Sequence, residues 1–141
     1  NKIIEMQAGL IPMYNPKVTT FKEKIYLIGD AATQLKASTG GGIVQGLVAA
    51  EELCKSICEN KNYDREWRKK LGKDLWTHLQ IRKYLNRFKD NDYDKLVSML
   101  KNNRLREILE KETRDNPSKF FVKMIKAEPK LLYFASKLFL G

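Results

Sequence analysis

The pattern of apolar and polar positions divides the chain into a first part with extended segments and a longer helical part. Ile25–Ile28 is a continuous apolar run, which is typical of a strand covered on both faces. From Ile43 to about Glu59, apolar residues recur with the roughly 3.6-residue period of a helix. We therefore expect a buried strand, a glycine-rich loop and a helix in Lys24–Leu53, and we expect the chain to be organised around this unit.

The expected helix carries two stripes that suit packing against a sheet. One stripe is apolar, and the other consists mainly of small residues that allow a neighbouring element to approach closely. The apolar stripe comprises Ile43, Leu47, Cys54 and Ile57, and the second stripe comprises Gly46, Ala49, Ala50 and Leu53. Upstream, short strands are expected at Lys2–Met6 and Val18–Phe21, with an interruption at Ile11-Pro12.

A polar break at Asn60–Asn62 precedes a helical remainder, and we place a domain boundary there. A long helix is expected from Asp64, as its N-cap, through Phe88. Inside this helix Gly72 costs up to about 1 kcal/mol relative to alanine, which is compatible with a close contact or a kink. Further helices are expected at Asp94–Leu100, Leu105–Lys111, Ser118–Ala127 and Lys130–Leu140, the last two started by Pro117 and Pro129.

Candidate chemistry lies on either side of the glycine-rich loop. Asp30 follows the expected strand, and ligands of open α/β sheets bind at the carboxyl ends of strands. Gly40–Gly42 let a ligand approach the backbone without a Cβ in the way. The helix that begins near Ile43 offers unpaired N–H groups and the positive end of its dipole. A carboxylate that accepts from sugar-like hydroxyls, together with a helix end that faces an anion, describes half of a nucleotide or flavin site.

These residues carry a family resemblance. Gly29–Ala32 (GDAA), followed within about ten residues by Thr39–Ile43 (TGGGI), resembles the second FAD motif of the flavoprotein hydroxylase-like superfamily. The variant KASTGGGI, with Ile11-Pro12 upstream, resembles the geranylgeranyl reductase family, which includes archaeal enzymes that saturate the isoprenoid chains of membrane lipids. Thr33 replaces the glycine often found after GDAA. The lead-in Lys36–Ser38 lacks the proline of the aromatic hydroxylases, which favours the reductases.

The helical tail resembles the geranylgeranyl reductase family more loosely, at Tyr63–Gly72, Leu96–Leu109 and Glu128–Leu132.

The resemblance implies a non-covalently held FAD, reduced by NAD(P)H or another reductant, and hydride transfer to an isolated prenyl C=C bond. It implies that Asp30 accepts a hydrogen bond from a ribityl hydroxyl. Gly29, Ala31 and Ala32 would shape that turn, and the N–H groups of Gly41, Gly42 and Ile43 would face the pyrimidine edge of the flavin. No catalytic proton donor is identified, because Lys36, Thr39 and Tyr26 are candidates only by proximity in sequence.

The implied fold is α/β overall with mostly α content. Residues 1–60 would be the C-terminal part of a Rossmann-like FAD/NAD(P)-binding domain, and residues 61–141 a helical C-terminal domain. The chain contains no GxGxxG after a strand and begins at Asn1. We therefore expect it to be the C-terminal portion of a larger flavoprotein, inactive alone and unable to hold FAD tightly without the missing N-terminal half of the same protein.

Composition adds a strong positive charge. The formal net charge is +10, from 27 Lys and Arg against 17 Asp and Glu. This charge is compatible with a solvated lysine-rich surface, with an anionic membrane surface or with nucleic acid, although no specific nucleic-acid motif is present. The apolar and basic segment Lys119–Leu140 could pack on its own core or contact a membrane that presents a prenylated lipid substrate.

The two cysteines and the single histidine give no sign of a disulfide or a metal site. Cys54 and Cys58 are four residues apart on one helix, where their geometry is poor for a bridge, so buried free thiols are expected. His78 lies elsewhere, and no metal is expected. Reduced thiols and the absence of a long apolar run indicate a cytoplasmic protein, with peripheral membrane contact left open. The competing hypotheses are a flavin monooxygenase or halogenase of the same superfamily, and a non-catalytic basic helical module.

Overall fold

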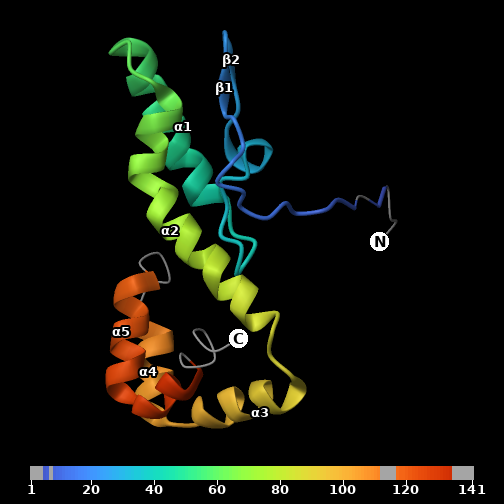
Figure 1. Cartoon of the computed structure of the whole chain (residues 1–141), viewed down its shortest axis with the longest axis vertical. Coiled ribbons are helices and arrows are strands. Elements are labelled where there is room, and N and C mark those ends of the chain that lie inside the picture. The colour runs from blue at the N-terminus through green and yellow to red at the C-terminus, as the bar shows by residue number, and fades with distance from the viewer. Residues whose placement is uncertain (1–4, 7, 112–116, 135–141) are drawn as a thin grey trace. The chain divides into compact units, whose positions relative to one another are not determined.

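The computed structural model describes residues 5, 6, 8–111 and 117–134, and most of these residues are helical, as the sequence predicts (Figure 1). The chain forms two compact units, Asn1–Leu75 and Trp76–Gly141. The division falls inside the long helix α2 (Tyr63–Leu85). Each unit is described by itself below.

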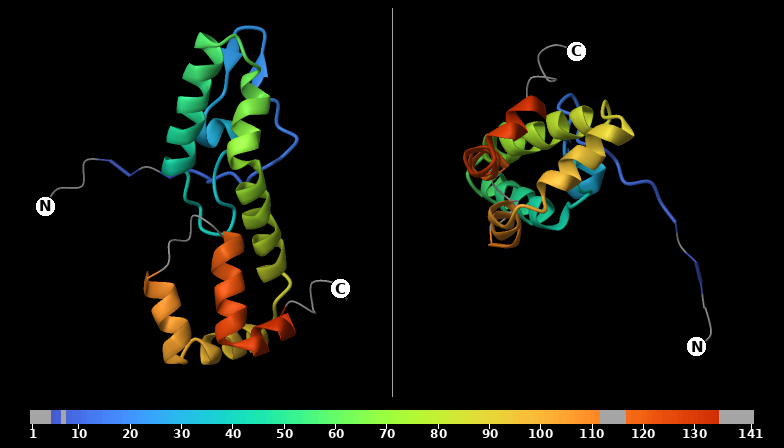
Figure 2. Two further views of the ribbon diagram at one scale, coloured as in Figure 1. Left: turned by 90° about the vertical axis from the view of Figure 1, so that its left-hand side faces the viewer. Right: turned by 90° about the horizontal axis from the view of Figure 1, so that it is seen from below.

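The first unit begins with a small hairpin and ends in helices. Strand β1 (Phe21–Lys22) pairs antiparallel with β2 (Ile25–Tyr26). A 3₁₀ turn, η1 (Gly29–Ala32), follows, and then helix α1 (Ile43–Cys58) and the start of α2. Figure 2 shows from a second side that η1 lies against α1. The predicted start of the helix at Ile43 is confirmed.

The prediction of a strand buried on both faces at Ile25–Ile28 is wrong. Strand β2 spans only two residues, and Ile25 is 67% exposed. The physical reason is that β2 pairs with a single, equally short strand, and the described residues form no larger parallel sheet whose two faces helices could cover. Within the described residues this antiparallel hairpin is the only sheet, and no described residue of the predicted Lys2–Met6 segment is in a strand. Residues 1–4 of that segment lie outside the described part.

Helix α1 turns its small residues inward and its apolar stripe outward. Ala49 is fully buried, whereas Ile43 is 83% exposed and Leu47 is 67% exposed. Both cysteines are free, but they are exposed, so the prediction of buried thiols is wrong. Cys54 lies on this outward stripe, and Cys58 is exposed four residues further along α1. The core of the unit comprises Tyr14, Ala32, Leu35, Ala37, Ala49, Tyr63, Trp67 and Leu75.

Helix α2 is capped by Asn62, whose Oδ1 accepts a hydrogen bond of 2.9 Å from the Arg65 N–H. The prediction of Asp64 as the N-cap is wrong, because its carboxylate bonds to Thr20 and Arg68 instead. The polar stretch that contains Asn62 joins α1 to α2 inside the first unit. A domain boundary between residues 60 and 61 stays a prediction.

The second unit consists of the end of α2, α3 (Asp90–Met99), α4 (Asn103–Lys111), α5 (Pro117–Ala127) and η2 (Pro129–Leu131). Helix α3 begins four residues before its predicted start. There the Lys89 N–H donates to Asp92 Oδ2 at 3.2 Å, which caps the helix. The predicted last helix is described only as η2 and the helical residues 132–134, and its remainder lies outside the described part. The core of this unit includes Leu79, Leu105, Met124 and Phe134.

Candidate functional site

The η1 turn presents Asp30 at its surface. Gly29 opens the turn with a φ of +65°, a conformation that favours glycine, and Thr33 closes it with a φ of +54°. The Thr33 N–H donates to Asp30 O at 2.9 Å, and the Gln34 N–H donates to Gly29 O at 2.9 Å. The backbone is thereby folded back on itself, and the Asp30 side chain is left exposed.

The glycine-rich loop brings the chain to the start of α1. The Lys36 N–H donates to Gly41 O at 2.9 Å, and the Gly40 N–H donates to Lys36 O at 2.8 Å. Gly40 has a φ of +73°, which explains a glycine at this position. Gly42 is the N-cap residue of α1, and no side chain caps this helix. The first-turn N–H groups and the positive end of the dipole are therefore available to a ligand.

The two predicted halves of the site meet in the structure. A Cβ built on Gly42 would lie 2.7 Å from Asp30 Oδ1 and 3.2 Å from Leu35 Cβ. A Cβ on Gly46, one turn further along α1, would lie 3.6 Å from the Cα of Gly29. The Asp30 carboxylate thus lies beside the N-terminus of α1, where the helix dipole favours negative charge. Glycine at position 42 leaves room for this carboxylate and for Leu35, and a side chain there would make both of them shift.

The other predicted ligand residues behave differently from one another. The Gly41 N–H donates to Thr39 Oγ1 at 3.3 Å, so it is directed into the loop in this conformation. Ile43 begins α1 with an exposed side chain, and Ala31 is exposed on the η1 turn. Contacts from Gly41, Gly42 and Ile43 to a cofactor stay a prediction. In the structure, Gly29 and Asp30 lie beside the first turn of α1.

A buried pair of polar side chains holds the η1 turn from the inside. Gln34 Oε1 accepts from the Gly29 N–H at 2.8 Å, and Gln34 Nε2 donates to the Tyr63 hydroxyl at 3.0 Å. The Tyr63 hydroxyl in turn donates to Leu27 O at 3.0 Å. Burial raises the pKa of Tyr63, and the Gln34 hydrogen bond opposes this only in part. The phenol therefore stays protonated as the donor in this chain of bonds.

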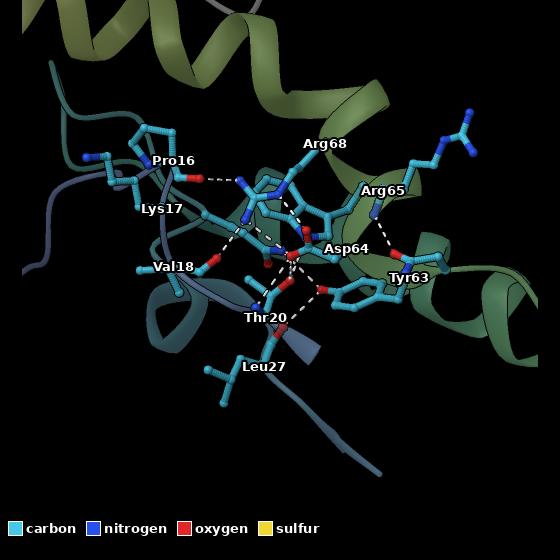
Figure 3. Close-up of polar contacts among 12 residues, drawn as sticks. Pro16, Lys17, Val18, Thr20, Leu27, Tyr63, Asp64, Arg65 and Arg68 are labelled. Carbon is cyan, nitrogen blue, oxygen red and sulfur yellow. Dashed lines mark hydrogen bonds and ion pairs between the residues drawn. The ribbon is translucent and has the colours of Figure 1, made fainter. Parts of the chain in front are cut away.

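A second network, next to the first, ties the segment before the hairpin to α2 (Figure 3). Thr20 Oγ1 donates to Asp64 Oδ1 at 2.5 Å and accepts from Trp67 Nε1 at 2.8 Å. Arg68 donates to Asp64 Oδ2 at 2.9 Å and to Val18 O at 2.6 Å. Burial alone would raise the pKa of Asp64, but hydrogen bonds from Arg68 and Thr20 outweigh it and lower the pKa. Both networks stabilise the fold of the first unit, and neither presents an exposed reactive group.

Sequence reasoning missed Gln34 and Tyr63 because nothing local marks them. The Gln34–Tyr63 bond joins residues 29 positions apart, and the Tyr63–Leu27 bond joins residues 36 positions apart. The available signal was a polar Gln34 directly before the apolar Leu35. That signal does not name a partner.

The three candidate proton donors lie in separate surroundings. Tyr26 stacks on Phe21, with 4.7 Å between ring centroids. Thr39 accepts from the Gly41 N–H, and the Lys36 side chain is half-buried in the same loop. Nothing in these contacts gives any of them an acidic role, and their assignment stays a prediction.

Comparison with known proteins finds no matching family model and no matching solved structure. Curated relatives do match. A digeranylgeranylglycerophospholipid reductase 2 of Methanothermobacter thermautotrophicus is 36% identical over 76% of this chain and 31% of its own length. A digeranylgeranylglycerophospholipid reductase of Methanocaldococcus jannaschii is 35% identical over 69% of this chain and 28% of its own length. The corresponding protein of Methanococcus vannielii is 31% identical over 96% of this chain and 35% of its own length.

The chain belongs to the geranylgeranyl reductase family. The suspected resemblance is thereby confirmed. The chain spans about a third of the length of the curated family members it matches. Within the described residues, no helix has the length and apolar character needed to cross a membrane, and no three His, Cys, Asp or Glu side chains gather as metal ligands.

Proposed function

We propose that the chain is the C-terminal part of an FAD-dependent reductase that saturates geranylgeranyl C=C bonds of archaeal membrane lipids. The names of the relatives support the reaction and the substrate class. The observation that carries the cofactor assignment is the approach of Asp30 Oδ1 to within 2.7 Å of the Cβ position of Gly42, beside an α1 N-terminus that no side chain caps. The carboxylate that would accept from a cofactor hydroxyl thus lies beside the helix N-terminus that would face an anionic group.

In this proposal residues 1–60 complete a Rossmann-like FAD-binding domain, and residues 61–141 form a helical domain. Asp30 accepts a hydrogen bond from a ribityl hydroxyl, and the turn that Gly29, Ala31 and Ala32 shape holds it there. The backbone N–H groups of Gly42 and Ile43 face the pyrimidine edge, and Gly41 joins them if its N–H releases Thr39. The site therefore needs only one side chain from this segment.

Bound FAD would supply the hydride for the reduction, with NAD(P)H or another reductant as the source of electrons. The contribution of this chain to the reduction is electrostatic. The first turn of α1 places fixed N–H dipoles where negative charge gathers on reduction, which stabilises the reduced cofactor. An isolated alkene develops little charge that the protein could bind, so orientation of the substrate has to supply much of the rate.

The outward stripe of α1 fits this proposal. Ile43, Leu47 and Ile57 are 83%, 67% and 60% exposed, and Ile25 of the hairpin is 67% exposed. Exposed apolar side chains that recur along one helix mark an interaction surface. We assign this surface to the remaining two thirds of the same protein, because the relatives are about three times as long as the aligned segment.

Peripheral contact with an anionic membrane is the proposed way to meet a prenylated lipid. In the second unit, exposed apolar and basic side chains occur together in the last turns of α5 and after it. They are Val122, Lys123, Lys126, Lys130, Leu132 and Tyr133. Sedimentation with anionic liposomes should be weakened by Leu132→Ser, whose leucine is 51% exposed. It should be unchanged by the control Val97→Ser in α3, whose valine is 59% exposed. Equal sedimentation with neutral and anionic vesicles would contradict this contact.

The cofactor assignment is tested in the complete protein. The purified protein should carry a flavin absorbance, and Asp30→Asn should weaken FAD binding by about tenfold. The asparagine oxygen still accepts a hydrogen bond, but a neutral bond is worth about 0.5–1.5 kcal/mol, whereas one to a charged group is worth about 1.5–3 kcal/mol. Asp94→Asn, an exposed aspartate in α3, is the control and should leave FAD binding unchanged. NAD(P)H-driven oxygen consumption coupled to hydroxylation would instead indicate a flavin monooxygenase.

A further inference from the structure

The Gln34 and Tyr63 side chains form hydrogen bonds with the backbone on both sides of Ile28, in the segment that leads into Asp30. Gln34 is fully buried and Tyr63 is 1% exposed. Gln34 Oε1 holds the Gly29 N–H at 2.8 Å, and the Tyr63 hydroxyl holds Leu27 O at 3.0 Å. The two side chains also bond to each other, at 3.0 Å from Gln34 Nε2 to the Tyr63 oxygen. One buried bridge therefore fixes the backbone positions Leu27 and Gly29.

This bridge adds a buried anchor to a turn that backbone hydrogen bonds from the Thr33 and Gln34 N–H groups close. The Asn15 N–H also donates to Thr33 Oγ1 at 3.0 Å, at the end of the turn. Gly29 and Thr33 both take positive φ values, +65° and +54°, and such conformations persist only when surrounding contacts impose them. Ile28, the N-cap residue of η1, has no side-chain capping hydrogen bond. The position of the Asp30 carboxylate, within 2.7 Å of the Cβ position of Gly42, depends on where this turn lies.

We propose that Gln34 and Tyr63 are positioning residues that set FAD affinity through Asp30. This inference rests on the proposed function. Tyr63 is the first residue of α2, so the segment that follows the polar break controls the geometry of the turn before α1. The bridge keeps the carboxylate beside the α1 N-terminus before the cofactor arrives, and this lowers the cost of ordering the site on binding.

A purely structural role predicts a different result from a role that acts through Asp30. A structural bridge changes FAD affinity by the same factor whether or not Asp30 is present, because independent sites add. A bridge that acts through Asp30 loses its effect once the carboxylate is removed. The test is therefore the coupling between each bridge residue and Asp30, measured as FAD dissociation constants.

The experiment uses the complete protein and fluorescence titration with FAD. Tyr63→Phe and Gln34→Met are made in the wild-type and Asp30→Asn backgrounds. Tyr84→Phe is the matched control, because its hydroxyl also donates to a backbone carbonyl, Phe134 O at 3.3 Å, in the second unit. We expect each bridge variant to raise the FAD dissociation constant about tenfold in the wild-type background and less than about twofold with Asp30→Asn.

Equal factors in the two backgrounds, or an unchanged dissociation constant in both bridge variants, would overturn the inference. If Tyr63→Phe does not fold, Gln34→Met decides alone, since it breaks the same bridge from the other end. If Asp30→Asn weakens FAD binding and the bridge variants do not, the inference fails while the proposed function stands. If the wild-type complete protein does not bind FAD, both fail.

Discussion

The approach of Asp30 to Gly42 makes Gly42→Ala the most informative single substitution in the first unit. The added Cβ would lie 2.7 Å from Asp30 Oδ1 and 3.2 Å from Leu35 Cβ, whereas carbon atoms in good contact lie about 3.5–4.0 Å apart. The exposed carboxylate can rotate away, but Leu35 is fully buried and has to shift with its surroundings. Overpacking of this kind costs roughly 1–3 kcal/mol.

Part of that cost is offset in the unfolded state. Gly42 has a φ of −129°, which alanine can adopt, and a compatible glycine-to-alanine change stabilises a protein by about 0.4–1 kcal/mol. We therefore expect Gly42→Ala to lower the free energy of unfolding by about 0.5–2 kcal/mol. In an Asp30→Ala background the 2.7 Å contact is absent and only the Leu35 contact remains, so the loss should be smaller by at least about 0.5 kcal/mol.

The assay is urea unfolding of the 141-residue chain, followed by the fluorescence of its two tryptophans. Trp67 is 1% exposed in the core of the first unit, so it reports on the unit that contains both substitutions. Gly41→Ala is the control, because the nearest atom to its Cβ is Thr39 Oγ1 at 3.4 Å, and it should change stability by less than about 0.5 kcal/mol. An equal cost of Gly42→Ala with and without the Asp30 carboxylate would refute the placement of Asp30 beside the helix.

Three further outcomes are expected. Gly72→Ala should raise the free energy of unfolding by up to about 1 kcal/mol, because a Cβ at this position of α2 meets nothing closer than Arg68 Cβ at 3.7 Å; a loss of stability in urea unfolding would point to strain that the structure lacks. Asp64→Asn should destabilise the chain near neutral pH, and a series of urea titrations should show this loss shrinking below about pH 4. The sign follows from the pKa of Asp64, which hydrogen bonds from Arg68 and Thr20 lower in the folded state because they outweigh burial. The carboxylate therefore stabilises the fold above its unfolded-state pKa, and this stabilisation is lost as pH falls through the folded-state pKa. A pH-independent difference between Asp64→Asn and the wild type would contradict this. Both cysteines should react with a thiol reagent in the native chain at rates close to those in urea, since both are exposed; protection of both thiols in the native chain would show that the stripe of α1 is covered.

The elements that depend on neighbours in sequence were predictable. The start of α1 at Ile43 follows from three glycines that precede a periodic apolar pattern, and the starts of α5 and η2 follow from Pro117 and Pro129. The candidate site was predicted as two separate pieces, the carboxylate of Asp30 and the glycine-rich helix start, because each has its own local signature.

The sequence by itself therefore determined the helices, the position of the glycine-rich helix start and the family to which the chain belongs. Tertiary structure alone decided that Asp30 lies against Gly42, that α1 buries Ala49 and exposes its apolar stripe, and that Gln34 and Tyr63 join across 29 positions. The reason is physical. Local pattern records backbone preference and amphipathicity within a few residues, whereas the partner of a buried polar group is set by which distant segments pack together.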